Sequence, residues 1–455
     1  MAINSSRFTL TMLIAVGVTV ATASAQQQRP RATELPAGSL PSWTGLYGGV
    51  AVGGGAMVDR VYSSAGGVSL NSDGLGGQGG IASIYGGVDY QILPRAVIGV
   101  LAEGSYFGLE TRTQAQAPDG SQATALIRGS WNWAALVRAG ILPTPSTLAY
   151  VVGGYTGQSF HSTGTATSGG STASFERDDT FNGWTLGTGL EAMVAKGWST
   201  KLEYRYSQYE TRSLGGTSID MRPTTHAVRL GLAYKFGGFG ESTAEEALAP
   251  EAPVDWTGIY LGGSAGLSSS VDRLSANFGN ANATVHGGGQ ALLGSGFAGA
   301  DYQVTERAVI GALGDVAWAG SQSVNTVTTS AGNATITSRP PMSFSLMGRA
   351  GYLVTPATLL YGAFGYTGEY VTTTATATSG GSTTTVSRDD YVNGWTAGPG
   401  IETVVSGQWT TRLEYRYSQY EEKAIPGGLA VQPSSHAVRA GLAYKFGAGK
   451  SSPSN

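Results

Sequence analysis

The nine residues Leu-Glu-Tyr-Arg-Tyr-Ser-Gln-Tyr-Glu at 202–210 decide the fold, and they return letter for letter at 413–421. Within them the charged Glu203 and Arg205 alternate with tyrosines. A strict period of two is typical of a β-strand whose faces meet two different environments. The sequence therefore predicts a strand with one charged face and one aromatic face.

The repeat extends far beyond these nine residues. Residues 43–237 recur as 256–447, each copy opening with Trp-Thr-Gly and closing with Gly-Leu-Ala-Tyr-Lys-Phe-Gly. This period is much longer than that of solenoid or propeller repeats. Each copy is therefore predicted to be a whole domain.

The ends of the chain and the segment between the copies differ from the repeats. Arg7, an apolar run over 8–20 and Ala23-Ser-Ala25 are typical of a cleaved secretory signal. An uncleaved anchor is less favoured because a spanning helix needs roughly 17–25 apolar residues. The predicted organisation is a signal peptide at 1–25, a leader at 26–42, the two repeated domains at 43–237 and 256–447, an Ala/Pro-rich acidic linker at 238–255 and a C-terminal tail at 448–455.

Composition narrows the class of protein. The chain has no cysteine, which excludes disulfides and thiolate metal sites, and its net charge of −3 without a long basic run gives no footprint for nucleic acid. Only 13% of the residues are charged, and Gly contributes 70 of 455. Soluble domains carry roughly twice that share of charge. We therefore expect an apolar solvent around most of the surface.

Eight segments of copy one show strand-like alternation. They lie at about 43–58, 77–91, 94–112, 124–142, 146–162, 180–195, 197–211 and 224–237. Short Pro/Gly turns alternate with long polar connections, predicted as loops at 59–76, 113–123, 163–179 and 212–223. An even strand number with short turns on one rim is the plan of a transmembrane β-barrel, whose closure leaves no unpaired edge in lipid. The predicted fold is all-β, with two tandem eight-stranded antiparallel barrels.

Charge decides which face points inward. Lys or Arg on the lipid face costs roughly 2–4 kcal/mol at the midplane. The charged positions keep their sign between the copies and are predicted to form a structural lumen network of Asp89, Glu103, Arg138, Glu191, Lys201, Glu203, Arg205, Arg229 and Lys235, matched by Asp301, Asp315, Arg349, Glu402, Arg412, Glu414, Arg416, Arg439 and Lys445. An eight-stranded barrel is just filled by its side chains. We expect a salt-bridged plug; the alternative is that the charges line a wet pore.

Aromatic residues are expected to form interfacial girdles. The candidates in copy one are Trp43, Tyr90, Trp131, Trp133, Tyr150, Trp184, Trp198, Tyr204 and Tyr206.

The end motifs carry a resemblance. The Trp-Thr-Gly-x-Tyr-x-Gly-Gly opening, the Leu-Glu-Tyr-Arg-Tyr strand and the Val-Arg-x-Gly-Leu-x-Tyr-Lys-Phe ending resemble the small outer-membrane immunogenic proteins of Gram-negative bacteria, a branch of the OmpA-like eight-stranded barrels in the porin family. The resemblance implies outer-membrane location, surface exposure as an antigen, contact with lipid and lipopolysaccharide, and insertion by the barrel assembly machinery with periplasmic chaperones. It also implies a closing-strand insertion signal at Tyr234, Phe236, Tyr444 and Phe446. Here Phe446 is followed by nine residues, whereas the family usually ends on the aromatic. Pro399, inside a predicted strand, indicates a bulge or a local loss of pairing.

Two arrangements of the strands remain open. The copies form either two barrels or one sixteen-stranded porin that conducts small hydrophilic solutes. The predicted periplasmic linker at 238–255 favours two barrels. The other turns on the short-turn rim use two to five residues, whereas this segment has about eighteen. Extended, it reaches up to about 60 Å. A role in envelope integrity and surface interaction, with at most weak small-solute permeability, is predicted; the ligand-binding alternative is a haemin-type surface protein.

Few residues suggest chemistry. Of the four histidines only His226 and His436 match between the copies, and we expect them to bond loop carbonyls at the rim, with an acyl-transfer site as the alternative. The Arg-Asp-Asp motifs at 177–179 and 388–390 are expected to be rim salt bridges or turns, the alternative being contact with lipopolysaccharide phosphate or a divalent cation. The glycine run at 48–55 lacks the Gly-Lys-Ser/Thr and the helix of a phosphate loop. The sequence predicts no enzyme, no cofactor and no metal.

Overall fold

The computed structural model describes residues 42–65, 68–213, 219–236, 254–278, 281–320, 322–329, 332–425 and 429–446. The predicted signal peptide, nearly all of the leader, most of the linker and the C-terminal tail lie outside the described residues. No helix in the described part of the chain is long and apolar enough to cross a membrane.

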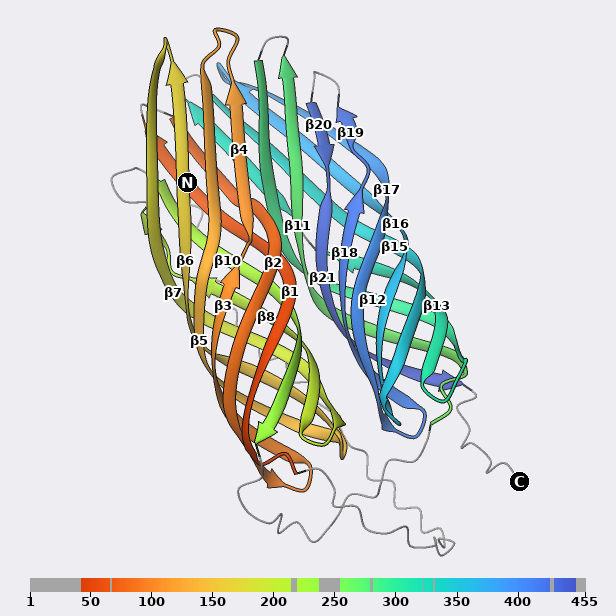
Figure 1. Ribbon diagram of the computed structural model, residues 1–455. Coiled ribbons are helices and arrows are strands. Elements are labelled where there is room, and N and C mark those ends of the chain that lie inside the picture. The colour runs from red at the N-terminus through yellow and green to blue at the C-terminus, as the bar shows by residue number, and fades with distance from the viewer. Residues whose placement is uncertain are drawn as a thin grey trace, which may run out of the picture. The chain divides into compact units, whose positions relative to one another are not determined.

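The chain is all-β in the described residues, which confirms the predicted fold class. In copy one the strands are β1 (Gly45–Ala65), β2 (Val68–Leu93), β3 (Ala96–Phe107), β4 (Glu110–Gln116), β5 (Gln122–Thr144), β6 (Thr147–Ser168), β7 (Ser171–Ala195), β8 (Trp198–Tyr209), β9 (Arg212–Ser213) and β10 (Ile219–Phe236). Figure 1 shows them as long, tilted ribbons.

Copy two repeats this order. Its strands are β11 (Gly258–Phe278), β12 (Ala281–Gln303), β13 (Ala308–Ala319), β14 (Ser323–Thr329), β15 (Gly332–Thr355), β16 (Thr358–Ser379), β17 (Ser382–Ser406), β18 (Trp409–Tyr420), β19 (Lys423–Ile425), β20 (Leu429–Gln432) and β21 (Ser434–Phe446).

The antiparallel pairing closes within each copy. In copy one it runs from β1 through β2, β3, β5, β6, β7 and β8 to β10, and β10 returns to β1 with Val50 opposite Leu232. In copy two β21 returns to β11 with Gly263 opposite Leu442. Below the hairpins each copy is therefore a ring of eight strands, and the short strands β4, β9, β14 and β20 continue positions of that ring toward the hairpin ends. Near the hairpin ends the pairing passes between the copies. Among the described residues β2 meets β4 at one position, Gln78 opposite Glu110, while β2 of copy one pairs with β14 of copy two and β4 of copy one pairs with β12 of copy two.

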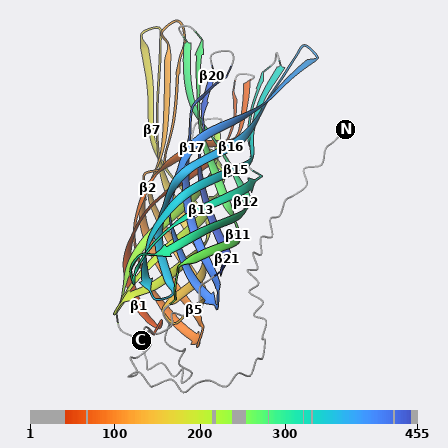
Figure 2. The same ribbon diagram turned by 90° about the vertical axis from the view of Figure 1, so that its right-hand side faces the viewer.

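The predicted long loops are wrong in extent, because most of their residues continue the strands as hairpins. β6 and β7 stay paired up to Ser168 opposite Ser171. Gly169 and Gly170 then form the turn with φ of 55° and 78°, the positive φ values that a tight type I′ hairpin turn requires. Threonine hydroxyls pair across the hairpin, for example Thr167 with Thr172 at 2.9 Å. Threonine favours strands, and the polar composition had suggested loops instead. Figure 2 shows these hairpins rising at the upper end.

Pro399 lies inside β17, as the sequence indicated. It is still opposite Gly362 on β16, but the pairing with β18 passes from Ala397 to Gly400 without including it. Proline has no N–H to donate to a ladder. The sequence left open a bulge or a loss of pairing, and the register, which is the same on both sides of the gap, shows a loss of pairing without a bulge.

The two faces of each ring strand meet different surroundings. Outward residues such as Val52, Ile84 and Val137 are 64%, 68% and 63% exposed, whereas the alternating inward residues are buried. This is the reverse of a soluble sandwich, where the exposed face is polar. Each ring thus has an apolar exterior, and its inward side chains are buried.

Candidate functional site

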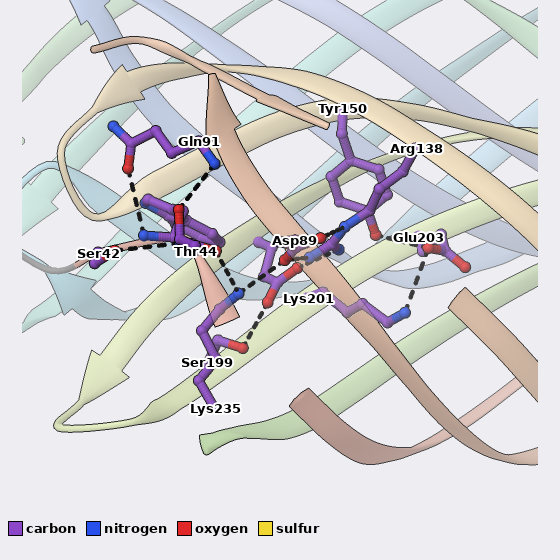
Figure 3. Close-up of polar contacts among 12 residues, drawn as sticks. Ser42, Thr44, Asp89, Gln91, Arg138, Tyr150, Ser199, Lys201, Glu203 and Lys235 are labelled. Carbon is purple, nitrogen blue, oxygen red and sulfur yellow. Dashed lines mark hydrogen bonds and ion pairs between the residues drawn. The ribbon is translucent and has the colours of Figure 1, made fainter. Parts of the chain in front are cut away.

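One group of buried ions lies near the short-turn end of the copy-one lumen. Arg138 on β5 donates through Nε to Asp89 Oδ1 on β2 at 2.7 Å and through Nη1 to Glu191 Oε2 on β7 at 2.7 Å. Lys235 on β10 contacts Asp89 Oδ2 at 2.8 Å. Ser199 donates to the remaining oxygen of Glu191 at 2.6 Å. Figure 3 shows Asp89 between Arg138 and Lys235. Two acids and two bases on four different strands therefore neutralise each other.

A second group of ions lies farther toward the hairpins. Arg205 on β8 contacts Glu103 Oε2 at 2.8 Å and Glu203 Oε1 at 2.7 Å. Arg229 approaches Glu103 Oε1 at 3.4 Å, and Lys201 approaches Glu203 Oε2 at 3.4 Å. Three bases meet two acids here, so this layer carries one excess positive charge. Charges removed from water need close partners of this kind, because each otherwise loses several kcal/mol of solvation.

Copy two builds the same two layers from its matched residues. Arg349 bonds Asp301 at 2.7 Å and Glu402 at 2.8 Å, and Lys445 contacts Asp301 at 2.6 Å. Arg439 contacts Asp315 at 2.9 Å, and Arg416 pairs with both Asp315 and Glu414. The structure brings all eighteen sequence-selected residues into the two lumens, and each is buried.

Aromatic rings inside the lumens contact the buried cations. The Arg138 guanidinium lies 4.7 Å from the centroid of the Tyr47 ring, and the Lys201 ammonium lies 3.7 Å from that of Tyr85. In copy two Arg412 lies 3.4 Å from the Phe297 ring centroid. Such contacts with desolvated cations are worth about 2 kcal/mol. The rings therefore supply part of the solvation that burial removes.

Three of the predicted girdle residues are placed wrongly. Trp43 is fully buried and donates through Nε1 to the Pro145 carbonyl oxygen at 3.0 Å. The Lys235 ammonium lies over the Trp43 ring, 4.9 Å from the ring centroid. Tyr150 is buried in the lumen and donates to Glu203 at 2.7 Å (Figure 3). Tyr204 faces outward but is buried in an apolar cluster of outward residues from both copies. Alternation alone cannot separate a lumen ring from an exposed one, because closure decides which strand end is covered.

Other girdle candidates lie on the outer surface. Tyr90, Trp131, Trp133, Trp184 and Trp198 are 59%, 68%, 46%, 48% and 43% exposed, and Tyr206 is half-buried. The closing-strand aromatics Tyr234 and Phe236 lie at the short-turn end of the outer face, with ring centroids 5.2 Å apart. Tyr444 and Phe446 repeat the pair at 5.0 Å.

Inward glycines make room for the ions. A Cβ on Gly99 of β3 would lie 2.2 Å from Asp89 Oδ1, and one on Gly311 would lie 2.3 Å from Asp301 Oδ1. Real Cβ atoms do not approach so closely, so the first ion layer depends on glycine at these positions.

An apolar layer, which the sequence reasoning missed, fills the copy-one lumen above the ions. Phe160 packs edge-on against Phe181 at 5.4 Å and against Tyr209 at 6.2 Å between centroids. Phe107 and Met57 join this cluster, and both are buried. Their inward register, continued beyond the charged positions of the same strands, was the available signal. The copy-one lumen is thus closed twice, by ions and then by packed side chains.

The two matched histidines have partners other than those expected. His226 lies 2.8 Å from the Tyr204 hydroxyl and 3.0 Å from Gln290 Oε1. His436 repeats this with Tyr415 at 2.7 Å and Gln78 at 3.0 Å. The expected loop-carbonyl bonds are therefore wrong. Neither histidine bonds a serine or a carboxylate within the described residues, which is what a nucleophile and base would need.

The hairpins carry their own surface ion pairs. Arg177 contacts Asp179 at 2.7 Å, and Arg388 contacts Asp390 at 2.8 Å. Arg128 donates to Glu110 at 2.7 Å, and this hydrogen bond holds the pKa of the Glu110 carboxyl below its usual value. In the part of the chain that is described, no three His, Asp or Glu residues gather in a group that could hold a metal ion. The Arg-Asp-Asp motifs are surface ion pairs on strands.

Closed rings with an apolar exterior, exposed aromatics and an interior of ion-paired charges define an integral β-barrel membrane protein. The chain belongs to the family of the outer membrane protein beta-barrel domain, whose family model matches residues 11–236 and 247–446. It is therefore an outer-membrane protein.

Relatives agree with this assignment. The chain is 27% identical over 209 residues to the 31 kDa outer-membrane immunogenic protein of Brucella melitensis, covering 43% of this chain and 84% of that protein. It is 31% identical over 206 residues to the 22 kDa outer membrane protein of Rhizobium leguminosarum, covering 44% of this chain and 83% of that one. A solved structure of Ail, the attachment invasion locus protein of Yersinia pestis, matches 42% of this chain and 99% of its own at 12% identity, with a TM-score of 0.23. The family match and the relatives from Brucella and Rhizobium confirm the resemblance seen in the end motifs.

Proposed function

We propose that each ring is a separate, plugged transmembrane barrel and that the protein acts in envelope integrity and surface interaction, without catalysis and with at most weak solute permeability. The observation that carries the proposal is the filled lumen. Each ring is crossed by two layers of ions. In the first layer Arg138, or Arg349 in copy two, donates hydrogen bonds to carboxylates on two other strands. Such a plug leaves no continuous water path at that level.

The long hairpins support the surface-interaction part of the proposal. β6 and β7 extend well beyond the lumen ions and end in exposed Ser, Thr and Gly. With the short turns facing the periplasm, these hairpins are the parts that reach lipopolysaccharide and molecules outside the cell. Tyr234, Phe236, Tyr444 and Phe446 are proposed to be what the barrel assembly machinery recognises, because they are outward aromatics on the closing strands.

The non-enzymatic part rests on the histidines. Among the described residues, the hydrogen-bond partners of His226 and His436 are one tyrosine and one glutamine side chain each. An acyl-transfer site needs a nucleophile that such a base can reach.

Planar-bilayer recording tests the proposal. Purified full-length protein is reconstituted, and its insertion is verified by protease cleavage of the hairpins from the added side. We expect no stable large steps of current. Large ohmic steps in verified bilayers would contradict the plugged barrels and favour a sixteen-stranded porin.

A further inference from the structure

The second copy contains a cavity at the level where the first copy is packed with aromatic rings. It measures about 540 Å³, within the range of roughly 300–1,000 Å³ typical of small-molecule pockets. Most of its lining side chains belong to copy two and follow the lumen from Arg439 toward the hairpins. The ion layers lie on its inner side.

The cavity exists because four inward side chains shrink between the copies. The strand register makes Val371 the counterpart of Phe160, since they face Asp390 and Asp179 respectively. In the same way Val392 replaces Phe181, Ala319 replaces Phe107 and Ser270 replaces Met57. Losing three rings and one methionine side chain leaves open space, and packed cores do not tolerate such space without cost.

An acid appears where the rings disappear. Gln158 faces Phe181 in copy one, and Glu369 faces Val392 in copy two. Glu369 lines the cavity together with Asp272 of β11. No Lys, Arg or His lies within ion-pairing distance of either carboxylate among the residues described, although Tyr420 interacts with Glu369. Arg439, at the inner end, already pairs with Asp315 at 2.9 Å.

Copy one shows what the fold does with the same acid when no cavity is present. Asp59, the counterpart of Asp272, is fully buried, and neither of its oxygens has a hydrogen-bond partner in the described residues. Asp272 instead is partly exposed toward the cavity. The cavity wall combines apolar side chains with hydroxyl groups and also includes Asp390 and Lys423, the latter paired with Glu421 at 3.0 Å. A half-buried carboxylate that lacks a cationic partner is stabilised by an opposite charge brought by a ligand.

We propose that this cavity binds an organic cation with an apolar body. Glu369 and Asp272 would receive the ammonium group, while Val371, Val392, Leu274 and Leu293 would surround the apolar part. Hydroxyls such as Ser268 and Ser343 line the remaining wall. Copy two supplies both acids and most of the lining, and copy one contributes Ser72, Leu75 and Thr113. The two copies have therefore diverged in function while each keeps its ion layers.

Two probes of equal shape test the charge requirement. 1-Naphthylmethylamine carries an ammonium at neutral pH, and 1-naphthalenemethanol replaces it by a hydroxyl. Each probe is titrated into full-length protein in detergent, and binding is measured by calorimetry. The amine should bind once per chain and at least about tenfold more tightly than the alcohol, because hydrogen bonds to charged groups are stronger than those between neutral groups. Equal affinity for both probes would overturn the proposal.

Variants then test the location. Val371→Phe/Val392→Phe restores the side chains that copy one accommodates and should weaken amine binding at least roughly 100-fold, because the ligand's space is filled. Glu369→Gln should weaken it roughly tenfold or more. Asp119→Asn, an exposed turn acid in copy one, is the control and should leave affinity unchanged.

The fold of each variant is verified by its heat-modifiable mobility on gels, and only folded protein is titrated. Amine binding that persists unchanged in both the Phe-filled and the Glu369→Gln proteins would overturn the proposal. Because conductance does not enter these measurements, failure here leaves the plugged-barrel proposal standing, and large conductance steps leave this one standing.

Discussion

Replacing Arg138 by methionine is the sharpest test of the ion plug. The change preserves a long side chain but removes the cation that bonds Asp89 and Glu191, both at 2.7 Å. Asp89 would keep Lys235 at 2.8 Å, and among the described residues Glu191 would keep its hydrogen bond from Ser199 at 2.6 Å. The layer then changes from neutral to one uncompensated negative charge.

The expected loss of unfolding free energy follows from that charge. Removing one partner of a buried ion pair costs about 3–5 kcal/mol, mostly because the other ion stays desolvated. Arg138→Met/Glu191→Gln restores neutrality, since Asp89 and Lys235 remain paired. We therefore expect the double variant to be more stable than Arg138→Met alone, although it has lost two native side chains.

Urea unfolding of the full-length protein in phospholipid vesicles, followed by tryptophan fluorescence, measures both variants. Arg349→Met is the matched control in copy two and should cost the same within error, because its bonds of 2.7 and 2.8 Å repeat those of Arg138. A cost under about 1 kcal/mol for Arg138→Met, or a double variant less stable than the single one, would refute the reasoning.

Three further predictions concern the strands around the plug. Gly99→Ala should destabilise copy one by about 1–3 kcal/mol in the same urea assay, because the added Cβ meets the Asp89 carboxylate of the first ion layer. Gly104→Ala on the same strand is the control and should leave stability unchanged, because the added Cβ would lie 3.9 Å from its nearest neighbour. Pro399→Thr should add about 1 kcal/mol of stability by supplying the missing ladder N–H; an unchanged urea midpoint would show that the gap in pairing has another cause. Val50→Cys and Leu232→Cys, opposite each other on β1 and β10, should form a disulfide in membranes, since antiparallel partners lie about 4.5–5.5 Å apart, and no shift on a non-reducing gel would contradict closure within the copy.

Hairpins and turns were only partly predictable. The Ser-Gly-Gly-Ser segment at 168–171 and its Thr-rich flanks were together predicted as one loop at 163–179, because their composition is polar. The structure pairs them through to Ser168 and Ser171. Polar residues on both faces satisfy a strand that stands in water, so alternation gives no signal there.

The copies' divergence was also hidden. Phe160 and Val371 are both apolar, and the sequence comparison treats them as equivalent. Their effect depends on three other side chains that approach from distant strands, among them Phe181 and Phe107. Only when all of these shrink together does the space become a cavity.

The sequence by itself determined the strand period, the duplication and the sign of each inward charge. These are local properties: alternation is read along one strand, and an ion cannot face hydrocarbon without a cost of several kcal/mol. Only the tertiary structure decided that β1 pairs with β10, that Trp43 lies under Lys235 while Trp198 stays on the surface, and that Arg138 reaches Glu191, 53 residues away. Those outcomes depend on closure, which brings together side chains that no local pattern relates.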